Sequence, residues 1–288
     1  MSLLFLVSLI WAFSFGLIGS RLAGIDPTAV AVLRLALALA VFLPFFRRGG
    51  LAAGAMLRLA LIGAVQFGAM YLFYLRAFRH LPSHEVALFT ITTPLFLALL
   101  DAARERRVRG RHFLAAMLAV AGAGVVLWRQ PISGGFLRGC LLVQASNVCF
   151  AAGQLAWRLE RGGLGASRGD ASVFALPYAG ALAVSVAWSV TATNWPALRL
   201  TFSQGLAITY LGVLASGLCF FWWNRGATQV NVGTLAAFNN AKVPLAVACS
   251  LLFFGESAPL LPLVAGGALM AFAVWVATRP PSGQRSIL

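Results

Sequence analysis

Long apolar runs follow one another along the whole chain, and each is closed by charged residues, glycine or proline. Most are close to the roughly 20 residues that a helix needs to cross the ~30 Å hydrocarbon core of a bilayer. The runs are continuous, unlike the alternating strands of an outer-membrane barrel, and backbone groups in lipid must pair internally. They therefore predict an all-α membrane protein of ten helices, at about residues 2–20, 28–46, 59–79, 84–101, 111–128, 138–158, 171–192, 203–224, 232–254 and 259–278.

The composition supports a membrane protein and argues against other classes. Of 288 residues, 60% are hydrophobic and only 10% are charged, which is too little charge for a soluble domain of this length. The net charge of +15 comes from arginines in short loops, without a motif of a nucleic-acid-binding fold. The four cysteines lie singly in apolar runs and lack zinc-site spacing. We expect the lipid bilayer as a partner, no nucleic acid, no metal and no other cofactor.

The distribution of basic residues predicts the orientation in the membrane. With the N-terminus inside, 14 arginines fall in cytoplasmic segments, 5 in outer segments and 3 basic residues within spans, which together account for the 22 Lys+Arg. Positive residues favour the cytoplasmic side. We therefore expect a multi-pass protein of a bacterial inner membrane with both termini in the cytoplasm.

The two halves of the chain resemble each other. The segment 88–95 (LFTITTPL) matches 238–245 (FNNAKVPL) in placing polar residues just before a proline in mid-run. An odd number of helices in each half would insert the second copy in the opposite sense, as in many transporters. We expect one five-helix repeat over 1–130, an inverted second repeat over 137–280 and a cytoplasmic tail over 281–288, which together form a basket-like bundle.

Lys242 is the only lysine in the chain and lies near the middle of the run 232–254. A charge at that depth is expensive and by default suggests a functional site. The alternative is a lysine that reaches an interface or a water-filled lumen without touching substrate. A fixed cation at this position can attract a substrate carboxylate, so we expect Lys242 to bind substrate.

The neighbours of Lys242 extend this candidate site. Asn239 and Asn240 can both donate and accept hydrogen bonds, and Asn239 lies nearer the helix face of Lys242. Pro244 and Pro94 lack an N–H, so each is expected to break its helix and to free a carbonyl, that of Asn240 or Thr90, for ligand or water.

Other polar and aromatic residues in mid-span complete the set of candidates. For each aromatic taken singly, packing is the alternative role, whereas clustering around one cavity would favour a flat ligand. Arg34 and Arg76 also lie within spans: we expect Arg76, near the outer end, to reach an interface, and Arg34, deeper in its span, to anchor the bundle or meet the cavity mouth. The remaining candidate substrate-binding residues are Trp11, Ser14, Gln66, Tyr71, Tyr74, Thr90, Gln144, Asn147, Trp223 and Asn224.

The sequence offers no machinery for catalysis. It lacks a P-loop, an HExxH motif and paired carboxylates within the apolar runs. His80, His84 and Glu85 cluster at a helix end, where we expect them to be interface residues that solvate the helix end rather than metal ligands. Because acidic residues are absent from mid-membrane positions, we do not expect proton coupling through a buried carboxylate.

The chain resembles the drug/metabolite transporter superfamily of the EamA type. The resemblance rests on the ten helices in two halves, the early segment 9–15 (LIWAFSF) and above all the segment 239–256, from NNAKVP to LLFFGE. Within this superfamily, the chain is similar in particular to the bacterial exporters of aromatic amino acids (YddG-like members). The resemblance implies a non-enzymatic transporter that exports amino acids, aromatic ones first, or related metabolites by alternating access.

Three alternatives remain at this point. The same architecture could carry organic cations, other drugs or nucleotide sugars, although a central lysine disfavours cations. A membrane-embedded enzyme would need a reactive set of residues that the chain lacks. A non-transporting scaffold would have no use for Lys242. A monomer would suffice for transport, and the sequence leaves the oligomeric state open.

Overall fold

The computed structural model describes residues 2–106, 110–127, 134–164, 169–230 and 232–278, and within these ranges it contains helices and no strand. The predicted all-α membrane fold is confirmed. Within the described residues, nine helical stretches are long and apolar enough to cross a bilayer, and a tenth contains the shorter apolar segment Phe113–Val126. The predicted tail over 281–288 lies outside the described residues.

The first half of the chain supplies five helical stretches. The third and fourth are interrupted, by a π-helical segment and by a 3₁₀ turn. Their elements are α1 (Ser2–Arg21); α2 (Pro27–Phe42) with η1 (Leu43–Phe45); α3 (Ala53–Gly63), η2 (Ala64–Ala69) and α4 (Met70–Ala77); α5 (Ser83–Phe89), η3 (Thr90–Thr92) and α6 (Thr93–Arg104); and α7 (Gly110–Leu127).

The second half supplies five more helical stretches, and again the third of them contains a π-helical segment. Short 3₁₀ turns, η4 (Asp170–Ser172) and η5 (Trp195–Ala197), flank α9. The helical elements are α8 (Gly134–Gly163); α9 (Ala175–Ala192); α10 (Phe202–Thr209), η6 (Tyr210–Leu218) and α11 (Cys219–Ala227); α12 (Val232–Phe253); and α13 (Leu260–Thr278).

The contacts between the halves are reciprocal. α1 packs on α12 and α11, while α8 packs on α6 and α4. α2 packs on η6, while α9 packs on η2 and α3. α7 with α13, α2 with α9 and α5 with α12 are direct pairs between the halves. When α8 is aligned with α1 and the later helices follow in order, each contact made by an element of one half matches a contact made by the corresponding element of the other half.

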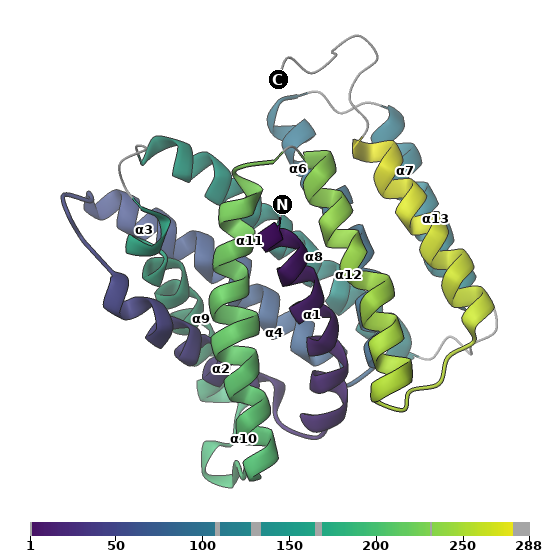
Figure 1. Ribbon diagram of the computed structural model, residues 1–288, viewed down its shortest axis with the longest axis horizontal. Coiled ribbons are helices and arrows are strands. Elements are labelled where there is room, and N and C mark those ends of the chain that lie inside the picture. The colour runs from purple at the N-terminus through teal and green to yellow at the C-terminus, as the bar shows by residue number, and fades with distance from the viewer. Residues whose placement is uncertain (1, 107–109, 128–133, 165–168, 231, 279–288) are drawn as a thin grey trace.

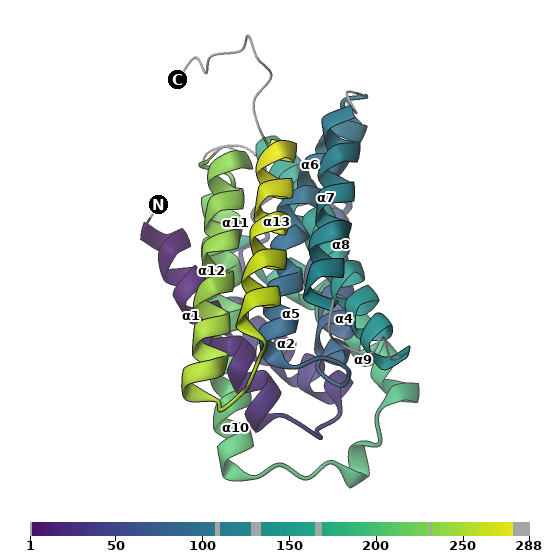
Figure 2. The same ribbon diagram turned by 90° about the vertical axis from the view of Figure 1, so that its right-hand side faces the viewer.

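Small residues let the helices approach closely. α7 and α13 lie side by side at one edge of the bundle (Figures 1 and 2). A Cβ on Gly122 would come within 2.8 Å of the Gly266 carbonyl oxygen, and one on Gly266 within 2.5 Å of the Gly122 carbonyl oxygen. Backbone contact at this distance is the way in which small residues pack helices in lipid.

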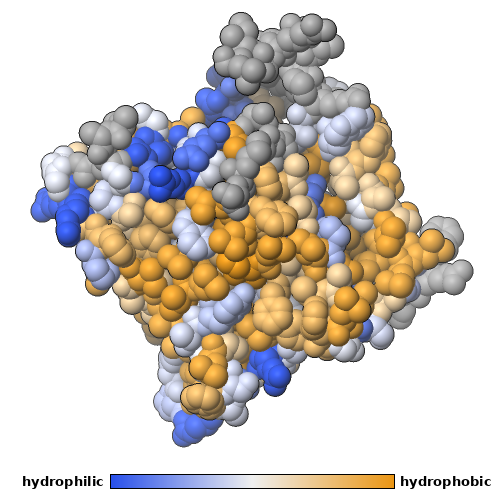
Figure 3. Space-filling view, viewed as in Figure 1, coloured by the Kyte–Doolittle hydropathy of each residue, from blue (hydrophilic) through white to orange (hydrophobic). Residues whose placement is uncertain are grey.

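The outer surface matches a bilayer. Figure 3 shows a wide apolar zone over the middle of one face, with polar residues gathered at its two ends. Large apolar side chains such as Leu261, 81% exposed, and Val190, 75% exposed, project from the bundle. A continuous apolar surface of this kind is expected of side chains that contact lipid.

Candidate functional site

Lys242 lies inside the bundle, with 7% of its surface exposed. Its Nζ donates a hydrogen bond to Asn239 Oδ1 at 2.9 Å and lies 5.2 Å from the centre of the Trp11 ring. Both partners are neutral, so the ammonium has no counter-charge among these contacts. A buried ammonium without an anion is a strong attractor for a negatively charged ligand.

A cavity opens beside Lys242, where α1, α2, α4, η3, α6, α8, α11 and α12 meet. The empty space of the cavity and its open mouth amounts together to about 550 Å³. Its wall is mainly apolar, with a few hydroxyl and amide groups and two cations. The lining residues are Trp11, Ser14, Phe15, Ile18, Arg34, Met70, Tyr71, Tyr74, Thr90, Thr93, Ser146, Asn147, Phe150, Phe220 and Lys242.

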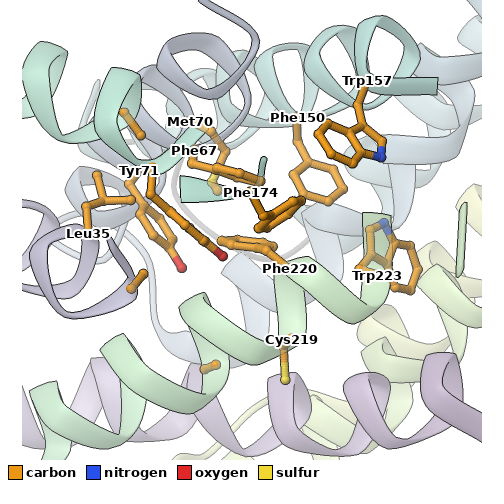
Figure 4. Close-up of a cluster of buried hydrophobic side chains, with 14 of the residues drawn as sticks. Leu35, Phe67, Met70, Tyr71, Phe150, Trp157, Phe174, Cys219, Phe220 and Trp223 are labelled. Atoms are coloured by element: carbon orange, nitrogen blue, oxygen red, sulfur yellow. The ribbon is translucent and has the colours of Figure 1, made fainter. Parts of the chain in front are cut away.

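Aromatic rings form one continuous part of the wall. Phe220 lies 5.2 Å from Trp11, 5.9 Å from Phe150 and 5.7 Å from Tyr71, measured between ring centres. Figure 4 shows Phe220 between Tyr71 and Trp223, with Phe150 beside it. Behind it, Phe67 stacks on Phe220 at 4.7 Å and holds the ring in place. Such a wall suits the flat or apolar body of a ligand.

Arg34 is the second cation of the wall and is 2% exposed. Its Nη2 donates to the Tyr71 hydroxyl at 2.7 Å, and its Nε donates to Ser216 Oγ at 3.2 Å. The guanidinium carbon also lies 4.3 Å from the Tyr71 ring centre. The groups that Arg34 contacts, like those that Lys242 contacts, are therefore uncharged.

Acidic groups are absent from this wall. All seven Asp and Glu residues of the chain lie within the described ranges, and none lines the cavity. Several of them pair with arginines near helix ends, as in Asp26 with Arg79 and Glu160 with Arg58. The charge inside the cavity is thus positive and uncompensated by any lining side chain.

Asn239 connects Lys242 to the first half of the chain. Its Nδ2 donates to the Thr90 carbonyl at 3.4 Å, where Thr93 Oγ1 also donates at 2.8 Å. The prediction that Thr90 offers a free carbonyl to ligand is therefore wrong: a neighbouring hydroxyl and the amide of Asn239, from the second half of the chain, occupy it. The helix does break at η3, next to Pro94, whereas α12 continues through Pro244.

Seven of the predicted site residues line the cavity together. They come from five helices and both halves of the chain: Trp11, Ser14, Tyr71, Tyr74, Thr90, Asn147 and Lys242. Gln144 lies just beyond this wall, where its Oε1 accepts from Thr92 Oγ1 at 2.7 Å and lies 3.4 Å from Asn147 Nδ2.

The other predicted residues lie behind the wall. Gln66 and Asn224 are fully buried and bind each other reciprocally, at 2.8 and 3.1 Å. Trp223 packs on Trp11 at 5.1 Å and borders a smaller, separate cavity with Asn239. Asn240 contacts the side chain of Asn239 at 3.4 Å and does not line the main cavity.

His84 is buried, with 3% of its surface exposed, at the start of α5. Its ring Nδ1 lies 2.6 Å from Glu256 Oε2, and the Ser83 and His84 backbone N–H groups donate to the same carboxylate at 2.9 and 3.0 Å. Burial alone would raise the pKa of Glu256, but these hydrogen bonds outweigh it and lower the pKa to about 2. Glu256 thereby ties the α12–α13 loop to the start of α5. Within the described residues, no group of three metal-ligating side chains forms.

Several lining residues were not predicted from the sequence. The apolar runs contain many similar residues, and only the packing of the helices determines which of them face the cavity. Examples are Thr93, Ser146, Phe150 and Phe220. Arg34 carried a signal, as a charge in mid-span, but the same signal marks Arg76, which instead donates to Thr28 Oγ1 at 3.1 Å outside the cavity.

Similarity to known proteins shows the family of the chain. The model of the EamA-like transporter family matches residues 1–128. The biotin transporter of Salmonella typhimurium is 37% identical over 96% of this chain and 92% of its own, and the probable biotin transporter of Pseudomonas aeruginosa is 38% identical over 96% of both.

More distant similarities point the same way. The threonine/homoserine exporter RhtA of Escherichia coli is 28% identical over 84% of this chain and 79% of its own. One crystal structure superposes with a TM-score of 0.65 at 21% identity, covering 96% of this chain and 95% of its own. At that identity the structural match bears on the fold alone.

Proposed function

The chain belongs to the EamA-like transporter family of the drug/metabolite transporter superfamily, and on this premise we propose that it carries a small carboxylate, biotin or a close analogue. It is a multi-pass membrane transporter and not an enzyme. Relatives named for biotin transport align with 96% of the chain, which makes biotin the first substrate to test.

The charge of the cavity is the observation that carries this proposal. Lys242 and Arg34 place two cations in a wall that contains no carboxylate. An anionic substrate would satisfy them, because a hydrogen bond to a charged group in a site of low dielectric is strong. An organic cation would be repelled and would find no counter-charge.

The remaining wall fits the body of such a substrate. The rings of Trp11, Phe150 and Phe220 offer apolar surface, whereas Ser14, Thr90 and similar groups offer a few hydrogen bonds. Biotin combines a carboxylate, an apolar chain and a compact polar ring system. Each of its parts therefore has a matching type of group in the wall.

Amino acids are the second candidate. The family resemblance of the sequence implies them, aromatic ones first, and RhtA is named as an exporter of threonine and homoserine. The aromatic wall suits an aromatic side chain. The ammonium of an amino acid, however, would have only neutral oxygens to bind, which ranks zwitterions below simple carboxylates.

Two inverted repeats, 1–130 and 137–280, would provide the transport mechanism. The reciprocal contacts between the halves support this proposal, as do the π-helical segments η2 and η6 in the third helix of each half. The cavity draws on both halves, so a rocking of one half against the other would open it to alternate sides of the membrane. The arginine distribution supports an inner-membrane location with cytoplasmic termini.

Counterflow in proteoliposomes tests the proposal. Vesicles with purified protein would be loaded with unlabelled biotin and diluted into labelled biotin, with a competition panel of amino acids, nucleotide sugars and organic cations outside. We expect saturable biotin counterflow that excess biotin blocks and organic cations do not. Counterflow of an amino acid without any of biotin would establish the second candidate instead.

A further inference from the structure

We propose that Arg34 is a second substrate-binding residue, which binds a carbonyl oxygen of the substrate while Lys242 binds its carboxylate. The proposal rests on the proposed function and adds a requirement on the ligand: a neutral hydrogen-bond acceptor at the end opposite the carboxylate. A ureido or amide carbonyl is an acceptor of this class.

One nitrogen of Arg34 carries the argument. The side chain is 2% exposed, and its Nη1 makes no hydrogen bond within the described part of the chain. The other two nitrogens are occupied by Tyr71 and Ser216. Buried donors are almost always paired, and a guanidinium in mid-membrane is costly, so an open position on its fork needs an explanation. Arg34 is part of the cavity wall, and its Nη1 has less than 1 Å² of accessible surface, so a ligand supplies the missing acceptor once a neighbouring side chain moves aside.

The geometry holds this fork rigidly. Ser216 accepts from Arg34 and also lies 2.8 Å from the Tyr71 hydroxyl, while its own Oγ donates to the Leu211 carbonyl in η6 at 2.7 Å. The guanidinium therefore sits in a fixed network of α2, α4 and η6. A preorganised donor of this kind adds selectivity, since little freedom is lost when the ligand binds.

A chain of ring contacts connects the two cations of the cavity wall. Arg34 contacts Tyr71, Tyr71 contacts Phe220, Phe220 contacts Trp11, and the Trp11 ring contacts Lys242. The aromatic rings between them would cover the apolar middle of a ligand. A substrate that uses the whole site thus has an anionic group, an apolar centre and a neutral acceptor.

A purely structural Arg34 is the alternative, because it already joins three elements. Arg76 offers a matched comparison. It is also an arginine within a span, and it joins α4 to α2 through Thr28, but it does not line the cavity. Substituting each arginine in turn distinguishes a residue that only links two helices from one that also contacts the substrate.

The test is equilibrium binding to the purified full chain of three ligands. These are biotin, biotinamide, which lacks the charge, and the thiolane analogue of biotin, which keeps the carboxylate and lacks the ureido group. Arg34→Lys keeps the charge and removes the fork. We expect about 10- to 100-fold weaker biotin binding, which is the loss of one hydrogen bond to a charged donor, and unchanged affinity for the thiolane acid.

The outcomes are distinguishable. Arg76→Gln should bind all three ligands as the wild type does, and Lys242→Gln should lose the preference for biotin over biotinamide. If Arg34→Lys binds biotin normally, or loses affinity for all three ligands by one factor, the inference is overturned. If the wild type binds no biotin, the proposed function itself fails. Arg34→Gln is the second variant, should Arg34→Lys not fold.

Discussion

Replacement of Lys242 by methionine separates the role of its charge from the role of its volume. The variant keeps an unbranched side chain in α12 and removes the ammonium. Among the residues that the structure describes, this ammonium contacts Asn239 Oδ1 and the Trp11 ring and no acidic group. Removal of an unpaired buried charge relieves a desolvation penalty of several kcal/mol, while the orphaned Asn239 oxygen costs about 1–3 kcal/mol. The melting temperature of the ligand-free variant should therefore equal or exceed that of the wild type.

Binding should change in the opposite direction. A hydrogen bond to a charged group contributes about 1.5–3 kcal/mol, so the Kd for biotin should rise about 10- to 100-fold. At a biotin concentration 100 times the wild-type Kd, the ligand stabilises the wild type by about 2.7 kcal/mol. The same concentration should stabilise Lys242→Met by only about 0.4–1.4 kcal/mol.

Thermal unfolding in detergent with and without biotin measures both quantities on one sample. Biotinamide is the matched control, because it lacks the carboxylate and should stabilise both proteins equally. A full biotin-induced shift in Lys242→Met would show that the ammonium does not bind the carboxylate, and the assignment of Lys242 would then be wrong.

Three further predictions concern stability. Glu256→Gln should lower the melting temperature at neutral pH. The pKa of Glu256 in the folded protein, about 2, lies below the ordinary 4.5, so the ionised carboxylate stabilises the fold fully above pH 4.5 and loses this effect as the pH falls towards 2. The difference in melting temperature between variant and wild type should therefore shrink over that range, and a difference independent of pH would contradict this. Gly63→Ala should destabilise by about 1–3 kcal/mol or more, because its Cβ would lie 1.9 Å from the Pro177 carbonyl oxygen, whereas Gly124→Ala, with open space around it, should be neutral or stabilising in the same melts. Gln66→Leu or Asn224→Leu alone should cost about 1–3 kcal/mol by orphaning a buried amide, and the double variant should recover much of that loss; additive losses in this cycle would refute the pairing.

The helices were predictable because lipid allows few alternatives. Backbone groups in hydrocarbon must pair within a segment, so an apolar run of sufficient length can hardly be anything but a helix. Several ends differ from the prediction, as in α8, expected over 138–158 and observed over Gly134–Gly163. A helix can continue beyond the bilayer, where hydrophobicity no longer marks its end.

The site was predictable only where one residue stood out. Lys242 is unique in composition and depth, and it does line the cavity. Gln66 and Asn224 have the same polar, mid-span character, yet they satisfy each other across 158 positions of sequence. The direction in which a side chain points depends on how the helix is rotated in the bundle, and two π-helical segments, η2 and η6, change that rotation locally. Neither segment has a signal in the pattern of apolar residues.

The central claim is that the cavity lined by both halves of the chain binds a carboxylate at Lys242. An experimental structure of the full chain with biotin bound tests it most directly. We expect a carboxylate oxygen within about 3 Å of Lys242 Nζ, and the rest of the ligand against Trp11, Phe150 and Phe220. A ligand in the cavity with its carboxylate far from Lys242, or a ligand bound outside this cavity, would contradict the account.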